Sequence, residues 1–436
     1  MKFTVNGKEY RGFRAETVGG TEVCDALLPL LSEDGDIRLV LDGTSLCYEK
    51  YEIEVGKDFV RLAGSYASLS ALSDIFAHDI KAGKEIKSVS GSIEKPKMPF
   101  ADKKELLRFI EYVYESDKMI FGEHLAGNMN PNEKIEKFYK AVGAHPSMMD
   151  FDMLRLKDNT QAAWSKALCE FVEFAEKGGV ITTMHHWLNP IDPSLAFRGY
   201  LGTLDDWRSL LTDGTPLNLK WREELDRAGE FMRALQDAGV VFMYRPMHEV
   251  NGNWFWFCAV QEKETIPADD VKAMWRYIYR YYKEKFGIEN ALFEYGPNIT
   301  NSETCPLPIM YYYPGDEYVD VVGLDWYTDG DSTQLDGNGK CYEELTATGK
   351  PFGLMEFGVS GNVRTGDREK QPSVFSCKNY VKMLDKMRAD GKKFAFAEVY
   401  AGQYGAPEFI GHGEALRECG YILFLEDMKE LIERRI

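Results

Sequence analysis

Two glutamates, Glu249 and Glu356, each follow an apolar run that has the length of a buried β-strand. Glu249 comes after His248 in the stretch YRPMHEVNGNWFWF, and Glu356 ends the stretch PFGLME. A charge at the end of a buried strand needs a partner or a task, because burying an unpaired charge is costly. Two facing carboxyl groups can hydrolyse a glycosidic bond, one as proton donor and the other as nucleophile or base. The structural alternative is that each acid pairs with an arginine from a neighbouring loop.

Other polar residues also follow apolar runs. Five of the seven histidines lie at or near such positions, namely His124, His145, His185, His186 and His248. The further polar residues at predicted strand ends are Glu123, Asp150, Asp152, Asn298, Asp325, Tyr327, Glu398 and Tyr400. If these strands form one parallel barrel, the side chains converge at its carboxyl end, where barrel active sites lie.

These polar residues follow apolar runs, of which there are eight with the length of a β-strand. The eight runs lie at residues 119–123, 147–150, 179–184, 240–245, 291–295, 319–324, 352–356 and 394–399. Helical patterns such as 219–238 and 271–286 separate most of them. Apolar strands that alternate with helices predict a parallel sheet covered by helices, and eight such units predict a closed (β/α)₈ TIM barrel of the α/β class. An open doubly wound sheet is the alternative, but no G-x-G-x-x-G follows the first strand.

In such a barrel, Glu249 and Glu356 follow the fourth and the seventh strands, on opposite sides of the mouth. Aromatic side chains near the strand ends could stack on the apolar faces of sugar rings. The candidates for this stacking are Trp187, Trp254, Trp256 and Trp326, and packing in the core is the alternative for each.

The first 95 residues predict a small α/β accessory domain, and residues 96–436 predict the barrel domain. Helical patterns near 23–31 and 67–80 accompany short apolar runs at 37–41, 51–55 and 59–64. The polar segment KSVSGSIEKPKMPFADKKE, rich in Ser, Lys and Pro, is typical of a linker. We therefore place the boundary near Lys95.

Composition and charge limit the classes of molecule that we expect this protein to bind. The formal charge of −18 repels phosphate backbones and anionic membranes, so neither nucleic acid nor a membrane is expected as a partner. The eight cysteines are scattered without a CxxC pair, which indicates neither a zinc site nor a disulfide framework. We expect no metal, no cofactor, and a monomer or weak homo-oligomer. The start MKFTVNGKEYRGF lacks the apolar core of a signal peptide, which favours a cytoplasmic location; secretion is the alternative if the natural protein carries a leader.

Four stretches carry a family resemblance over about residues 100–436. YRPMHEVNGNWFWF resembles the strand-four signature of glycoside hydrolase family 26, the β-mannanase family. MHHWLNP, VDVVGLDWY and PFGLMEFG resemble the strand-three, strand-six and strand-seven segments of the same family. The resemblance implies a retaining glycoside hydrolase that cleaves β-1,4-mannosidic linkages of mannan or mannooligosaccharides.

The resemblance also implies roles for single residues. Glu249 matches the general acid/base and Glu356 the nucleophile. His248 matches the histidine beside the acid/base, and Trp254 matches the subsite tryptophan. His186 matches the strand-three histidine, and Tyr327 matches the strand-six tyrosine that touches the nucleophile. We add four candidate substrate contacts because they lie near strand ends: Trp187, Trp326, Asn298 and His185.

Two departures bear on substrate choice. His185 occupies the usual Trp position of strand three, and the strand-eight stretch FAFAEVYAG lacks the expected Trp. Mixed-linkage β-glucan and β-1,3-xylan therefore remain alternative substrates. The N-terminal stretch YEIEVGKDFVRLAGSYASLSALSDIFAHDI resembles the small α/β domain that precedes the barrel in several exo-acting glycosidases, which suggests exo action. A metal-dependent barrel hydrolase and a non-catalytic sugar-binding barrel are the rival functions.

Overall fold

The computed structural model describes residues 97–435 apart from the gaps 126–129, 159–160, 302, 329–334, 336–339, 360–375 and 403–404. Between residues 2 and 92 it describes nine short backbone strands. In these described parts, no helix combines the length and the apolar character that a membrane span requires.

The N-terminal strands form two sheets, one in the order β8-β7-β3-β2-β1-β9 and one in the order β4-β5-β6. Their bounds are β1 Lys2–Val5, β2 Lys8–Val18, β3 Thr21–Ala26, β4 Leu39–Asp42, β5 Ser45–Tyr48, β6 Tyr51–Glu54, β7 Phe59–Leu62, β8 Ser65–Ser68 and β9 Val89–Ser92.

Both predicted N-terminal helices are wrong at their first residues. Residues 23–26 belong to strand β3, where Val23 pairs with Glu16 and Cys24 pairs with Ala15 of β2. Residues 67–68 belong to β8. A sheet ladder has overridden the local helical pattern, as tertiary pairing often does. The rest of both predicted helices lies outside the described residues, and the boundary near Lys95 stays a prediction.

The eight predicted barrel strands are confirmed, with shifted ends. They are β10 Met119–His124, β11 Met148–Asp152, β12 Val180–Met184, β13 Phe242–Arg245, β14 Ala291–Tyr295, β15 Val321–Thr328, β16 Phe352–Val359 and β17 Phe396–Val399. Every neighbouring pair is parallel, and pairing of β10 with both β11 and β17 closes the ring. A short strand, β18 (Ile422–Leu423), adds to β10. The fold is thus a closed parallel (β/α)₈ barrel.

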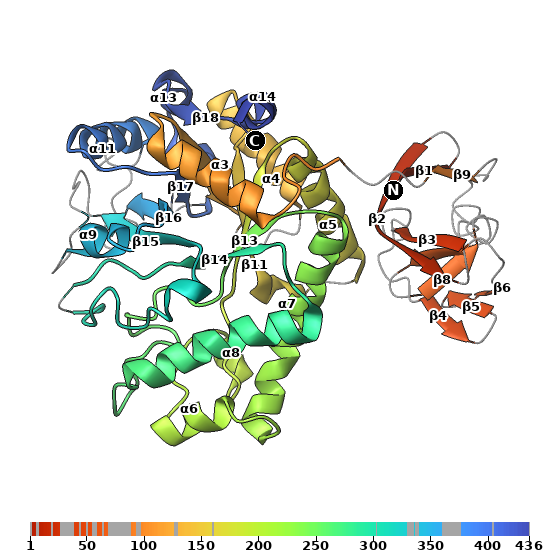
Figure 1. Ribbon diagram of the computed structural model, residues 1–436, viewed down its shortest axis with the longest axis horizontal. Coiled ribbons are helices and arrows are strands. Elements are labelled where there is room, and N and C mark those ends of the chain that lie inside the picture. Colours follow the sequence, from red (N-terminus) through yellow and green to blue (C-terminus); the bar gives the residue numbers. More distant parts are fainter. Residues whose placement is uncertain are drawn as a thin grey trace.

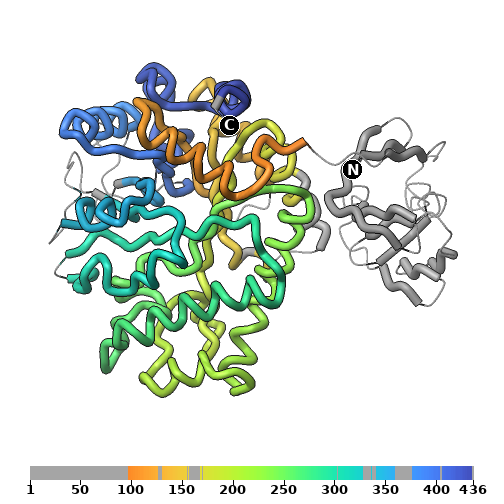
Figure 2. The backbone as a smooth tube through the Cα atoms, in the orientation of Figure 1, coloured from red at the N-terminus to blue at the C-terminus, as the bar shows by residue number. Residues whose placement is uncertain are grey.

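Helices surround this ring (Figure 1). The α-helices are α3 Lys103–Glu115, α4 Pro131–Val142, α5 Gln161–Glu176, α6 Leu204–Leu210, α7 Pro216–Asp237, α8 Ala268–Phe286, α9 Cys341–Thr346, α11 Cys377–Ala389, α12 Pro407–Ile410, α13 Glu414–Glu418 and α14 Leu425–Arg435. The first and last helices of the barrel domain, α3 and α14, lie at the same end (Figure 2). Their apolar residues, including Phe109, Ile110, Met428 and Ile432, share one core cluster.

The barrel interior is built in layers. Each strand supplies one residue to an apolar floor, which consists of Ile120, Met148, Val180, Met243, Leu292, Val321, Met355 and Phe396. Residues two positions apart on a strand face the same side. Two positions further toward the carboxyl ends, five strands bear buried polar residues, namely Asp150, Thr182, Arg245, Glu294 and Glu398. A charged layer therefore lies directly on the apolar floor and beneath the barrel mouth.

Candidate active site

Glu249 and Glu356 meet at the barrel mouth. Glu356 lies within β16, and Glu249 lies four residues beyond the end of β13. Both are nearly buried, with exposed fractions of 8% and 5%. One oxygen from each of Glu249, Asp325 and Glu356 lies within 4.8 Å of the other two. The predicted convergence of these two acids is therefore what the fold produces.

Two donors hold the Glu249 carboxyl group. Trp254 Nε1 donates to Oε2 at 2.7 Å, and Asn298 Nδ2 donates to Oε1 at 2.5 Å. Burial and the nearby negative charge of Glu356 raise the pKa of Glu249 to about 7, although the two hydrogen bonds partly oppose this shift. Near neutral pH this carboxyl group can therefore carry a proton, which a general acid requires.

The backbone at Glu249 is left-handed, with a φ of 53°. A non-glycine residue rarely adopts this conformation unless its surroundings hold it there. Here the Glu249 N–H donates to the carbonyl of Gly296 at 2.9 Å, and its carbonyl accepts from Gly252 at the same distance. These bonds turn the chain sharply after β13 and direct the carboxyl group toward Glu356.

Glu356 is held by different partners. Tyr327, the predicted neighbour of the nucleophile, donates its hydroxyl to Oε2 at 2.7 Å. Arg245 donates Nη2 to Oε1 at 3.2 Å. A charged donor and a hydroxyl donor both stabilise a negative carboxylate. The two glutamates thus have different surroundings, because a charged donor reaches Glu356 and neutral donors reach Glu249.

Sequence reasoning did not assign a role to Arg245, although it ends β13 within the quoted motif. Its guanidinium is buried and also donates to Asp325 Oδ1 at 2.5 Å and Asp150 Oδ2 at 3.0 Å. These carboxylates, together with Glu356, outweigh burial and raise the pKa of Arg245, so it stays charged. Its side chain lies against Gly296, where an added Cβ would come within 2.8 Å of Arg245 Cδ. The sequence signal that could have identified Arg245 is its place as the last residue of a strand, in the phase whose side chains point into the barrel.

His186 and His248 lie next to each other. Their Nε2 atoms lie 3.2 Å apart, and His186 Nδ1 lies 3.0 Å from Asp152 Oδ2. Burial and the positive charges of His186 and Arg245 lower the pKa of His248, so its ring stays neutral. One ring nitrogen of His186 thus faces Asp152 and the other faces His248. The pair is therefore held in one arrangement.

A family model described as glycosyl hydrolase family 26 matches residues 97–372. The chain belongs to glycosyl hydrolase family 26. The matched segment includes every residue named above in the site and ends beyond β16. It leaves out the N-terminal strands and the end of the barrel.

Several known proteins similar to this family 26 chain carry mannanase names. A mannan endo-1,4-beta-mannosidase of Bacillus subtilis is 29% identical over 198 residues, which cover 45% of this chain and 52% of the relative. Mannan endo-1,4-beta-mannosidase A and B of Caldalkalibacillus mannanilyticus is 28% identical over 218 residues, covering 49% of this chain and 39% of the relative. The chain thus spans about half or less of the length of these relatives.

A solved structure, the Bacillus subtilis mannanase BCman, is similar to this chain with a TM-score of 0.62 at 20% sequence identity. The match covers 76% of this chain and 96% of that protein. At this identity the likeness supports the barrel fold and no finer property.

Three candidate substrate contacts of the family 26 chain are corrected to packing residues. Trp187 is 0% exposed, donates Nε1 to the carbonyl of Pro246 at 2.7 Å and stacks on His185. His185 faces Glu224 of helix α7, with Nε2 and Oε2 3.4 Å apart. Trp326 is buried and stacks on Phe357. Side chains at successive strand residues point to opposite faces, so a residue next to a site residue faces the helices.

Further strand-end residues contact neighbouring side chains. His124 stacks on Tyr400, with ring centroids 4.4 Å apart. Glu123 pairs with Lys134 of α4, which also pairs with Glu408 of α12. In the described part of the chain, the histidines do not join a group of acids or cysteines that could bind a metal; the group spaced for a cation is Glu249, Asp325 and Glu356. Arg245 already supplies the positive partner of two of these acids.

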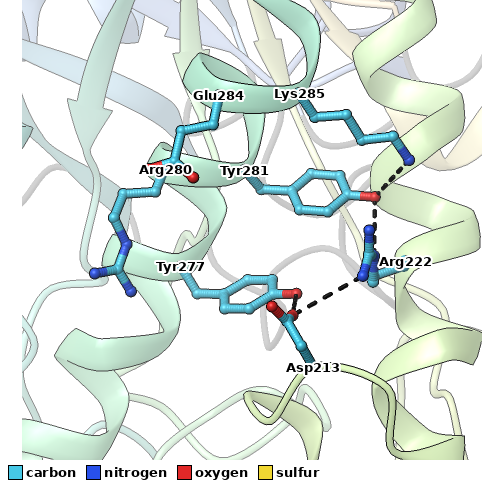
Figure 3. A pocket seen from close by; sticks show the side chains of 7 residues that line it. All are labelled: Asp213, Arg222, Tyr277, Arg280, Tyr281, Glu284 and Lys285. Carbon is cyan, nitrogen blue, oxygen red and sulfur yellow. Dashed lines mark hydrogen bonds and ion pairs between the residues drawn. The ribbon is translucent and has the colours of Figure 1, made fainter.

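A cavity of about 650 Å³ lies on the outer wall, between α7 and α8 (Figure 3). The hydroxyl of Tyr277 donates to Asp213, and the hydroxyl of Tyr281 accepts from Arg222 and Lys285. These charged groups satisfy one another, and the cavity shares no residue with the carboxyl cluster. The cavity therefore lies apart from the two glutamates and is not the candidate reaction site.

Proposed function

We propose that the family 26 chain is a retaining glycoside hydrolase that cleaves β-1,4-mannosidic linkages in mannan or mannooligosaccharides. The observation that carries this proposal is the pair Glu249 and Glu356, whose carboxyl oxygens lie within 4.8 Å and whose partners differ. Retaining enzymes place the two groups about 5–5.5 Å apart, whereas inverting enzymes leave room for a water at about 6.5–9.5 Å. The spacing supports direct attack by one carboxylate.

In the first step, a Glu356 oxygen attacks the anomeric carbon and forms a covalent ester bond. The glycosidic C–O bond breaks, and protonated Glu249 gives its proton to the departing oxygen. Arg245 and Tyr327 orient Glu356 for the attack through their hydrogen bonds. The raised pKa of Glu249, about 7, keeps a proton available near neutral pH.

In the second step, water replaces Glu356 at the anomeric carbon, and Glu249 takes the proton of that water. This reversal of role needs the proton affinity of Glu249 to fall. The negative charge of Glu356, which raises the pKa of Glu249 in the free protein, disappears when the ester forms. The same pair of residues therefore supplies an acid first and a base afterwards.

The sugar would contact residues around the two acids. Trp254 is partly exposed beside Glu249 and can stack on a sugar face while its N–H holds the acid. His186 and His248 offer a polar edge in a fixed orientation. The relatives are named endo-acting mannosidases, and we propose endo attack; the exo action suggested by the N-terminal resemblance has no support among them.

Product analysis tests the substrate and the mode of attack. Mannohexaose labelled at the reducing end is incubated with the protein, beside mixed-linkage β-glucan and β-1,3-xylan as alternative substrates. Endo attack on mannan produces labelled fragments of several lengths at early times. Release of only one or two sugars from one end would overturn endo attack, and turnover of another polymer alone would overturn the mannan assignment.

The nucleophile is tested by Glu356→Ala. The variant loses the attacking oxygen, so we expect turnover to disappear while oligosaccharide binding, measured by calorimetry, persists. A variant that retained even a tenth of the wild-type rate would contradict the role of Glu356.

A further inference from the structure

Asp325 is a third carboxyl group between the two glutamates. It is fully buried, and one of its oxygens lies within 4.8 Å of an oxygen of Glu249 and of Glu356. Arg245 Nη1 donates to Oδ1 at 2.5 Å. Among the described residues, no group donates to Oδ2. The carboxyl group of Asp325 therefore has Arg245 as its positive partner, and this charge-assisted hydrogen bond fixes the direction of Nη1.

An irregularity in the sheet places Asp325 at this point. Leu324 of β15 pairs with Leu354 of β16, but the next residue, Asp325, pairs with Glu356. The extra residue on β16 is Met355, which fills the apolar floor. Extra residues of this kind occur next to active sites, where they redirect side chains. Because paired residues on neighbouring strands point to the same face, Asp325 and Glu356 both point into the barrel.

The guanidinium of Arg245 is shared between the two carboxylates in a directional way. Nη1 donates to Asp325, whereas Nη2 donates to Glu356 at 3.2 Å and to Asp150 at 3.0 Å. The guanidinium is planar, so fixing one nitrogen fixes the direction of the other. Without an acceptor for Nη1, the guanidinium could rotate toward Asp150 and leave Glu356 without its charged donor.

We propose that Asp325 is a positioning residue for the nucleophile: it holds Arg245 in the orientation that orients Glu356 for attack. This inference rests on the proposed glycosidase activity and deepens it. It assigns Asp325 to the nucleophile half of the site. The acid half is held separately by Trp254 and Asn298, which donate to Glu249.

The test compares Asp325→Asn, Asp325→Ala and a matched control, Glu294→Gln. Glu294 of β14 is as buried as Asp325 and lies in the polar layer below it, but it accepts from Thr182 and bonds to neither catalytic glutamate. The values of kcat and KM are measured on mannohexaose and on a mannooligosaccharide with a 2,4-dinitrophenyl leaving group. The second substrate needs no proton from Glu249 in the first step, so it isolates the nucleophile.

A displacement of about 1 Å at a reacting group can cost about 10²-fold in rate. We therefore expect Asp325→Ala to lose about 10²-fold in kcat on both substrates, with KM within about threefold of wild type. Asparagine keeps an oxygen acceptor for Arg245, so Asp325→Asn should recover about tenfold of that loss. Glu294→Gln should stay within about threefold of wild type on both substrates.

Three results would overturn the inference while leaving the proposed function intact: an Asp325→Asn variant as slow as the alanine variant, full recovery on the activated substrate, or equal losses in the Glu294→Gln control. Circular dichroism on each variant checks folding, and the isosteric asparagine variant decides the outcome if the alanine variant does not fold. A wild-type protein without activity on either substrate would instead overturn the proposed function, and this inference with it.

Discussion

Replacing Trp254 by Phe separates the two tasks of that side chain. The indole N–H donates to Glu249 Oε2 at 2.7 Å, while the ring covers Gly252, where an added Cβ would lie 2.5 Å from Trp254 Cη2. Phenylalanine keeps an aromatic surface in the same place and removes the donor. Asn298 remains as the other donor to Glu249, so the acid keeps its position.

The expected shift follows from what the lost bond does to each protonation state. A hydrogen bond to a charged group contributes about 1.5–3 kcal/mol, and one to a neutral group about 0.5–1.5 kcal/mol. The N–H of Trp254 therefore favours the ionised form of Glu249 by about 1–1.5 kcal/mol, which corresponds to about one pKa unit. Because that bond lowers the pKa of Glu249, losing it raises the pKa from about 7 to about 8.

The assay is the pH dependence of kcat/KM on mannohexaose, because this ratio reports the acid of the free enzyme. In the proposed mechanism the protonated form of Glu249 is the active one, so activity should fall as pH rises through its pKa. We expect this alkaline limb to move upward by about one pH unit. The matched control is Trp256→Phe, since Trp256 Nε1 donates to the carbonyl of Trp187 and not to Glu249. An unmoved limb, or one displaced to lower pH, would refute the reasoning.

Two further substitutions test Arg245, which pairs with the buried acids, and Trp187, which packs in the core. Arg245→Met removes the positive partner of Asp150, Asp325 and Glu356, so we expect a loss of about 3–5 kcal/mol in the free energy of unfolding at pH 7. Chemical denaturation should show a smaller loss at pH 5, where buried acids take up protons; an equal loss at both pH values would contradict this. Trp187→Phe removes the bond to Pro246, so we expect about 1–3 kcal/mol less stability with KM within about twofold of wild type, and a large rise in KM would place Trp187 in the site after all.

The barrel was predictable from the sequence because its signal is repeated. Eight apolar runs separated by helical patterns leave few alternative folds, and each run corresponds to a strand of the ring. The N-terminal segment carries no comparable repetition. Residues 23–26 illustrate the difference, because their local pattern favours a helix while pairing with β2 makes them a strand. Long-range pairing of this kind leaves little trace in a short stretch of sequence.

The site was predictable where a residue stands at a strand end and has a family match, as Glu249 and Glu356 do. It was not predictable where the direction of a side chain decides the matter. His185 and His186 are neighbours in the sequence, yet His185 faces α7 and His186 contacts Asp152 and His248. Arg245 shows the opposite error, because its side chain points into the barrel from within the quoted motif and yet sequence reasoning assigned no role to it. Side chains alternate in direction along a strand. This alternation, together with the exact residue at which the strand ends, distinguishes residues that face the site from residues that face the helices.

Several buried acids lie at and below the barrel mouth. Asp150, Glu294 and Glu398 lie below the two glutamates and Asp325 lies between them, and burial raises the pKa of each of these four carboxyl groups. Arg245 is the cation that pairs with acids of this group among the described residues. A site with several acids and one guanidinium can keep only some of the acids ionised, because like charges at short range disfavour each other. Glu356 receives two donors including the guanidinium, whereas Glu249 bonds to no cation among the described residues, and burial together with the charge of Glu356 favours the protonated form of Glu249. The different partners of the two glutamates thus follow from the direction in which Arg245 points.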